Sequence, residues 1–109
     1  DGDKIQRVFD NLLRNAVLYG YPDTEIVITA EVRGGKAVIC FRNHGDAIPE
    51  GKLARIFEQF YRLDAARSSS SGAGLGLAIA RQIVELHGGA IEAGSAKDMI
   101  EFTVKLPLS

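Results

Sequence analysis

The spacing of apolar residues near the start of the chain predicts an amphipathic helix. Apolar side chains recur over residues 5–17 with the period of about 3.6 residues that places them on one helical face. Asp3 to Gln6 has the form of a capping box, and Gly20 and Pro22 are typical of the end of a helix. The apolar positions are Ile5, Val8, Phe9, Leu12, Leu13, Ala16 and Val17.

Strict alternation of apolar and polar residues predicts two β-hairpins. Residues 26–33 alternate, and the Gly34-Gly35 pair leads into a second strand at 36–42. A second pair of strands is expected around 90–94 and 100–106. Each pair of strands is close enough in the sequence to be joined by a tight turn.

Two further helices separate these hairpins. Residues 52–60 form a short amphipathic pattern after a loop at 43–51, and residues 75–87 follow a polar segment at 61–74. His87-Gly88-Gly89 is typical of a helix stop. The apolar side of the last helix is expected to hold Ile79, Ile83 and Leu86. This order predicts an α/β fold, a two-layer sandwich in which three helices cover one face of a mixed, mostly antiparallel sheet.

Composition narrows the classes of function. The 109 residues predict a single domain spanning 1–109, and 13 Lys and Arg against 14 Asp and Glu leave a net charge of −1. This balance gives no reason to expect nucleic acid or an anionic membrane as a partner. Cys40 is the single cysteine and is expected to be a small buried apolar residue. Because the chain begins at Asp1, we expect it to be part of something longer.

Three glycines stand directly before the last helix, at Gly72, Gly74 and Gly76. Glycine allows close backbone approach, and the free N–H groups of a helix N-terminus can bind phosphate. The residues alone leave two hypotheses of about equal weight, a phosphate loop and a flexible turn. No Gly-Lys-Ser/Thr follows, so the loop is not a Walker A motif, and no parallel-strand pattern precedes it as in a Rossmann fold.

Two asparagines, Asn11 and Asn15, are four residues apart on the first helix and therefore share one side of it. Asn is a poor residue for a helix interior, so the pair costs stability. The amides are either solvent-facing groups or oxygen ligands for Mg²⁺, which prefers oxygen and often bridges phosphates.

Four segments resemble motifs of the sensor histidine kinases. Residues 11–16 resemble the N box, residues 56–62 the F box, residues 72–79 the G2 box, and residues 102–107 the closing strand. They occur in the family order and cover nearly the whole chain. The resemblance implies membership of the gyrase, Hsp90, histidine kinase and MutL superfamily, with its Bergerat fold.

The resemblance also implies roles for individual residues. Asn15 corresponds to the Mg²⁺ ligand, Asn11 to a catalytic residue near the phosphates, and Tyr19 to an aromatic residue beside the nucleotide. Arg62 corresponds to a catalytic basic residue that reaches the phosphates, and residues 64–72 to the ATP lid. The residues that correspond to the phosphate-facing loop are Gly72, Gly74, Leu75, Gly76 and Leu77.

The adenine motif departs from the family pattern, which is Asp-x-Gly-x-Gly-Ile-Pro. Asn43 replaces the Asp that accepts a hydrogen bond from the adenine amino group, Gly45 is retained, and Ala47 replaces the second Gly. Loss of the charge predicts an ATP affinity lower by roughly tenfold, and Ala47 is expected to narrow the pocket if it requires positive φ. Leu18 stands where a basic residue is common. Asn43 and residues 60–69 are similar to vancomycin-resistance sensor kinases of the VanS type.

The function implied is a protein-histidine kinase domain that binds ATP and Mg²⁺ and donates the γ-phosphoryl group to a His on a separate dimerisation domain. Its partners would be that phosphoacceptor domain and a response regulator, and it would be the cytoplasmic part of a membrane-anchored sensor that does not itself contact the membrane. The chain alone is expected to bind nucleotide without phosphorylating itself. His44 and His87 are not expected to accept phosphate.

Two alternatives remain open. Asn43, Ala47 and Leu18 also fit a degenerate nucleotide-binding or regulatory module with weak or no ATP binding. A hydrolysing ATPase of the same superfamily ranks third, because such enzymes carry a Glu general base at the position of Asn11 and an amide cannot take a proton from water.

Overall fold

A computed structural model describes residues 2–58 and 76–108. Its elements in chain order are α1 (Gly2–Tyr19), β1 (Ile26–Arg33), β2 (Lys36–His44), α2 (Glu50–Leu53), α3 (Gly76–Leu86), β3 (Ala90–Ala96) and β4 (Met99–Pro107). The four strands form one sheet in the order β1-β2-β4-β3. All three described pairings are antiparallel, so the sheet expected to be mostly antiparallel is entirely so in this part of the chain.

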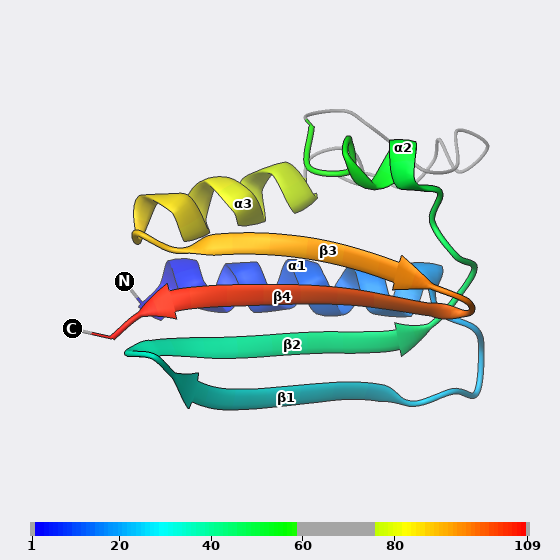
Figure 1. Ribbon diagram of the computed structural model, residues 1–109, viewed down its shortest axis with the longest axis horizontal. Coiled ribbons are helices and arrows are strands. Elements are labelled where there is room, and N and C mark those ends of the chain that lie inside the picture. The colour runs from blue at the N-terminus through cyan, green and yellow to red at the C-terminus, as the bar shows by residue number, and fades with distance from the viewer. Residues whose placement is uncertain (1, 59–75, 109) are drawn as a thin grey trace.

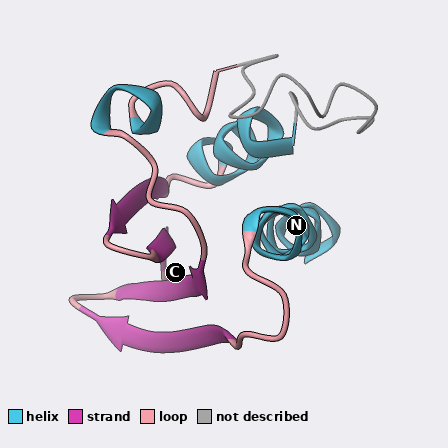
Figure 2. Cartoon of the chain, turned by 90° about the vertical axis from the view of Figure 1, so that its right-hand side faces the viewer, coloured by secondary structure: helices cyan, strands magenta, loops and turns pink. Residues whose placement is uncertain are grey.

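The helices and the sheet form two layers. Figure 1 shows α1 behind the sheet and α3 along the β3 edge, and in the turned view of Figure 2 α1 and α3 lie on the same side of the four strands. The short α2 lies beyond β3, near the end where β3 turns into β4. The expected two-layer sandwich with helices on one face is therefore confirmed, with α2 at its edge.

The core lies between α1, α3 and the strands β2 and β4. Paired residues of antiparallel strands share a face, so Phe41, Phe102 and every second residue on either side of them point toward the helices. Full burial of such a side chain stabilises the fold by about 1.5–3 kcal/mol. The buried core residues on these elements are Val8, Leu12, Ala16, Phe41, Leu77, Ala80, Ile83, Val84, Ile100, Phe102 and Val104.

Glycines end the first hairpin and the last helix as the sequence predicts. Gly34 and Gly35 have φ of 57° and 77°, the left-handed geometry of a tight hairpin turn. At the end of α3, Gly88 has φ of 79°, and the amides of Gly88 and Gly89 donate to the carbonyls of Glu85 and Val84. This pair of hydrogen bonds is a Schellman motif, which satisfies carbonyls left unpaired at the helix end.

Several local predictions were wrong. Asp3 lies inside the first turn of α1, so it is not the N-cap residue of a capping box. The second helix is Glu50–Leu53 and not 52–60, because it begins directly after Pro49 and continues as turns from Ala54. The strand β2 extends to His44, so the loop begins two residues later than expected.

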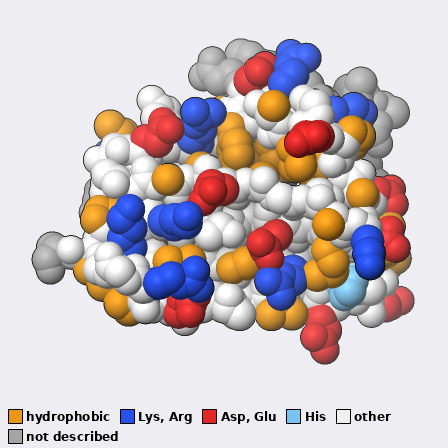
Figure 3. All heavy atoms as spheres, viewed as in Figure 1, with side chains coloured by type: hydrophobic (Ala, Val, Ile, Leu, Met, Phe, Trp, Pro, Cys, Tyr) orange, Lys and Arg blue, Asp and Glu red, His pale blue; other side chains and the backbone are white. Residues whose placement is uncertain are grey.

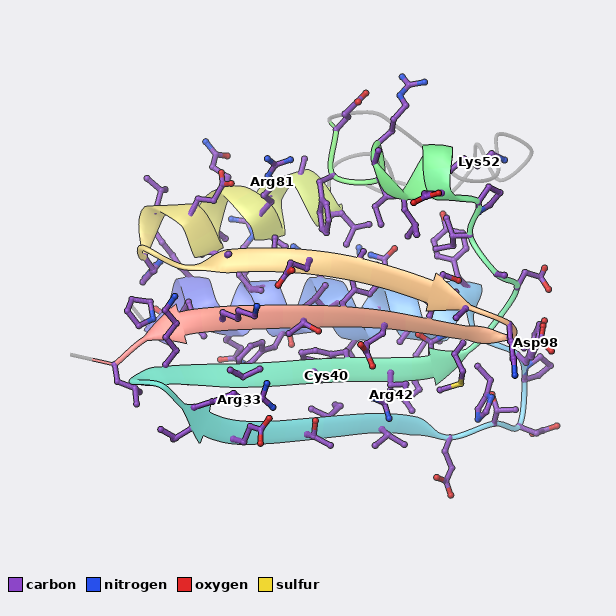
Figure 4. The ribbon with its side chains drawn as sticks, in the orientation of Figure 1. Arg33, Cys40, Arg42, Lys52, Arg81 and Asp98 are labelled. Carbon is purple, nitrogen blue, oxygen red and sulfur yellow. The ribbon has the colours of Figure 1, made fainter. Side chains whose placement is uncertain are left out.

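Two side chains also differ from expectation. Leu86, expected beside Ile79 and Ile83, is exposed at the last turn of α3. Cys40 is half-buried and not fully buried, because its position in β2 points away from the helices. Figure 4 shows Cys40 and Arg42 on the outer face of the sheet, which is the face away from α1 and α3. Partial burial is the largest cause that raises the pKa of the Cys40 thiol.

Candidate nucleotide site

The asparagines of α1 lie together beside its buried stripe. The Asn15 amide nitrogen donates to the backbone carbonyl of Asn11 at 3.0 Å, and both side chains are half-buried. Phe9, on the other side of the stripe, contacts Phe41 of β2 with ring centroids 5.7 Å apart. One N–H of the Asn15 amide is engaged by the helix backbone, and its side-chain oxygen is the atom that can coordinate a metal ion.

Asn43 is the one buried polar residue among those that the structure describes, with 2% of its surface exposed. It lies on the inner face of β2 beneath the end of α1, where Gly20 and Gly45 form a bridge between the two segments. Its amide nitrogen donates to the carbonyl of His44 at 3.3 Å. No donor among the described residues contacts its side-chain oxygen.

Close backbone approach explains the two glycines around this amide. A Cβ on Gly45 would lie 2.6 Å from the Tyr19 carbonyl oxygen and 2.9 Å from Ile100, and a Cβ on Gly20 would collide with the carbonyl of Ala16. Neither glycine has positive φ. The retained Gly45 is therefore required for packing, and the same is true of Gly20, whose role the sequence analysis did not assign.

A cavity of about 400 Å³ reaches Asn43 from the β1 side of α1. Its walls combine the end of α1 with the start of β1, and its lining includes Ala16, Val17, Gly20, Tyr21, Ile26 and Asn43. Neither Asn11 nor Asn15 lines this cavity. The Asn43 amide thus lies beneath the end of α1, between the cavity and the rest of the core.

The loop after β2 is held in place by side-chain hydrogen bonds that were not predicted from the sequence. The Tyr21 hydroxyl donates to Asp46 at 2.7 Å and lies 3.4 Å from Asp98, which Figure 4 shows at the β3–β4 turn. The hydrogen bond to Asp46 is the largest cause that raises the pKa of Tyr21 to about 12. These residues are far apart in the sequence, and only the sheet register brings them together.

The same loop is held from the other side by Ser95. The Ser95 hydroxyl accepts the amide of Ile48 at 2.9 Å and donates to the carbonyl of Met99 at 3.0 Å. Ala47 lies between these contacts, is exposed, and has no positive φ. The condition under which Ala47 was expected to narrow the pocket is therefore not met, because its backbone does not adopt the left-handed conformation.

The remaining predicted site residues fall into two groups. Tyr19 is half-buried and packs against the core, and Leu77 is buried in it, while Gly76 begins α3. The predicted Arg62, Gly72, Gly74 and Leu75 and the lid at 64–72 lie outside the described residues. Within the described part of the chain, no cluster of three or more His, Cys, Asp and Glu side chains could hold a metal ion.

The two histidines occupy structural positions. The His87 ring nitrogen Nδ1 lies 2.8 Å from the carbonyl of Ile83, at the end of α3 where the helix dipole favours such a contact. His44 is exposed at the end of β2.

The whole chain, residues 1–109, matches the family of histidine kinase-, DNA gyrase B- and HSP90-like ATPases. The chain belongs to this family of ATP-binding domains. It is 53% identical to the Sensor protein VanS of Enterococcus faecium and 46% identical to the Sensor protein VanSC of Enterococcus gallinarum, each over 98% of its length. It spans 28% and 30% of those relatives, which are therefore much longer proteins.

Solved structures place the chain among the sensor histidine kinases. The catalytic domain of histidine kinase ThkA superposes with a TM-score of 0.85 at 32% identity, covering 98% of this chain and 68% of that one. The mycobacterial sensor histidine kinase MprB superposes with a TM-score of 0.86 at 30% identity, covering 98% and 74%. The predicted fold and the resemblance to VanS-type sensor kinases are both confirmed, and the chain corresponds to the catalytic ATPase domain of such kinases.

Proposed function

We propose that this domain binds Mg²⁺-ATP. The base would lie at Asn43, and the phosphates would lie beside Asn11 and Asn15 of α1. The domain would then donate the γ-phosphoryl group to a His on a separate domain. The observation that supports this proposal most strongly is the buried Asn43 oxygen, which no donor among the described residues contacts. An unsatisfied buried acceptor costs about 1–3 kcal/mol, and an adenine amino group would remove that cost.

The proposed metal ligand is Asn15. Its side-chain nitrogen donates to the carbonyl of Asn11, and this contact orients the amide whose oxygen would meet the metal. Mg²⁺ prefers hard oxygen ligands and retains water, so one protein oxygen together with the nucleotide phosphates can hold it. The metal would supply charge neutralisation at the phosphates.

The chemistry then requires positioning more than a reactive side chain. Phosphoryl transfer depends on alignment and on neutralising the charge of the transferring group. We assign alignment to Asn11 and charge neutralisation to Arg62, with Tyr19 beside the nucleotide and the glycines at 72–76 facing the phosphates. Because Asn11 cannot act as a general base, transfer to a His is favoured over hydrolysis by water.

The length of the relatives supports a proposal about the partners of this domain. The chain spans less than a third of sensor proteins that contain further regions. We propose that a dimerisation and phosphoacceptor domain lies in the same longer protein and that a response regulator receives the phosphoryl group. None of the described helices is long and apolar enough to cross a membrane. From the family resemblance, we propose that the domain lies on the cytoplasmic side of a membrane-anchored sensor.

Asn43 also motivates a second candidate, a regulatory module whose pocket no longer binds ATP. The two candidates differ in one measurable property, which is saturable and Mg²⁺-dependent nucleotide binding. Calorimetric titration with a non-hydrolysable ATP analogue, with and without Mg²⁺, separates them. The proposal requires binding that Mg²⁺ strengthens.

The metal assignment has its own variant. Asn15→Ala should remove the Mg²⁺ dependence of binding while the circular dichroism spectrum stays unchanged. Leu13→Ala, an exposed position on the same helix, is the matched control and should retain the dependence. A full Mg²⁺ dependence in Asn15→Ala would refute the metal site.

A further inference from the structure

We propose that Asn43 widens the base specificity of this site, so that purine nucleotides with a 6-oxo group bind with an affinity close to that of ATP. The inference rests on the proposed function and adds to it the class of base that the site accepts. It starts from the chemistry of the one buried polar side chain of the described residues.

The Asn43 amide carries two N–H donors and one acceptor oxygen. One N–H is directed at the carbonyl of His44, at 3.3 Å, and no donor among the described residues contacts the oxygen. Among the described residues no hydrogen bond accounts for the second N–H or for the oxygen, and Asn43 lines the cavity of about 400 Å³ beside the end of α1. A carboxylate at this position would offer acceptors only.

The two kinds of purine differ in what they require at position 6. Adenine carries an amino group that donates, and hypoxanthine and guanine carry an oxygen that accepts. The Asn43 oxygen can accept from the amino group, and the second Asn43 N–H can donate to the 6-oxo group. At position 6 itself a carboxylate would meet the 6-oxo group with repulsion between two acceptors, so in that contact it favours the amino group of adenine.

The surroundings of the amide make this difference large enough to measure. The side-chain nitrogen lies 3.2 Å and 3.4 Å from the positions that Cβ atoms on Gly20 and Gly45 would occupy, so both backbones close around it. Burial of this kind strengthens a matched hydrogen bond and increases the cost of a mismatched one. Sites that hydrogen-bond a substrate group reject analogues that leave the site's polar groups unpaired.

The test compares ATP with ITP, which differ in the base only at the 6-position and the adjoining N1. Calorimetric titrations with Mg²⁺-ATP and Mg²⁺-ITP are made on the unmodified chain, on Asn43→Asp and on His44→Asp. His44→Asp adds the same charge one residue away, on the opposite face of β2, and is the matched control. Circular dichroism checks that each variant is folded.

We expect the two nucleotides to bind the unmodified chain within about tenfold of each other, since each forms one neutral hydrogen bond with Asn43. In Asn43→Asp the preference for ATP over ITP should grow by about tenfold or more, and in His44→Asp it should not change. An unchanged preference in folded Asn43→Asp would overturn the inference.

The unmodified chain decides the question even if Asn43→Asp does not fold. A preference for ATP above about tenfold in the unmodified chain would overturn the inference, because it exceeds the difference expected between two neutral hydrogen bonds. This outcome leaves the proposed function intact, since ATP still binds. Failure of both nucleotides to bind the unmodified chain would instead refute the proposed function, and the inference with it.

Discussion

The strands β4 and β1 belong to one sheet and show the same alternation of apolar residues, yet their burial differs. In β4 the inward-facing Ile100, Phe102 and Val104 are all buried. In β1 most residues on the same face are exposed, with Ile28 at 50% and Val32 at 71%, and Ile26 is only half-buried. The difference arises because α1 and α3 cover the middle and the β3 side of the sheet, while β1 lies at the opposite edge (Figure 2).

The comparison separates the direction of a side chain from its burial. Alternation determines which face of the sheet a side chain occupies, but a covering helix determines whether water is excluded. The candidate base site lies at the covered end, where Asn43 pairs with Ile100 of β4. The outer face of the sheet is solvated, and Figure 3 shows charges of both signs interspersed over it.

The largest effect on stability is expected from a cavity created in the region that the helices cover. Leu12 on α1 is fully buried, so Leu12→Ala should lower the free energy of unfolding by about 2–5 kcal/mol. Val32→Ala, at the uncovered edge, should change it by less than about 0.5 kcal/mol. Urea denaturation of both variants measures the difference, and equal effects would contradict the assignment of the core.

A smaller effect is expected from added volume at the base site. Gly45→Ala places a Cβ against the Tyr19 carbonyl and Ile100, and overpacking of this kind costs about 1–3 kcal/mol. Gly94→Ala in β3 is the matched control, because nothing lies within 4 Å of the added atom. Thermal unfolding should show a lower Tm for Gly45→Ala alone. A Tm for Gly45→Ala as high as that of the control would mean that the loop is not closely packed.

On the solvated face of the sheet, the ion pair of Arg42 and Glu101 should make a small, pH-dependent contribution to the free energy of unfolding. The hydrogen bond from Arg42 is the largest cause that lowers the pKa of Glu101. A carboxyl whose pKa is lower in the folded state stabilises the fold above its unfolded pKa of 4.5, and this contribution is lost as the pH falls through the folded pKa. Because both side chains are well exposed, the loss should stay below about 1 kcal/mol.

Urea titrations between neutral and acidic pH measure this contribution. Glu101→Gln should show a shallower loss of stability in that range than the unmodified chain. Glu50→Gln, an exposed residue of α2, is the control and should follow the unmodified chain. Parallel curves for Glu101→Gln and the unmodified chain would show that the Arg42 pair does not contribute.

The smallest effect is expected at Tyr21, which is exposed. Its pKa is raised from 10.0 to about 12, so the hydrogen bond to Asp46 contributes below pH 10 and is lost as the pH rises through about 12. Absorbance of the phenolate should therefore show one tyrosine that ionises late, and this late phase should disappear in Tyr21→Phe. Asp46→Asn should move that phase toward the ordinary value.

Much of the fold could be predicted because its signals are local. The alternation in 26–33 and 100–106, the Gly34-Gly35 turn and the His87-Gly88-Gly89 stop each depend on neighbouring residues. The exposure of Leu86 and Val32 could not be predicted, since it depends on which elements lie over them. The short α2 reflects weak local helix formation after Pro49, with Gly51 in its first turn.

Part of the candidate site could also be predicted from local sequence, and part of it could not. The pairing of Asn11 with Asn15 follows from helical spacing, and Asn43 and Gly45 were found through a motif that the chain only partly retains. The close approach of Gly20 to Gly45 and the contacts of Tyr21 and Ser95 depend on the sheet register, for which the sequence holds no local signal.

The central claim is that a nucleotide binds this domain with its base at Asn43. The most direct measurement is a nuclear magnetic resonance titration of the nitrogen-15-labelled chain with a non-hydrolysable ATP analogue and Mg²⁺. We predict saturable shifts in the Asn43 side-chain amide, in the backbone amides of Gly20 and Gly45, and in Asn15. A titration without saturable shifts at millimolar nucleotide, or with shifts that leave the Asn43 amide unchanged, would contradict the account.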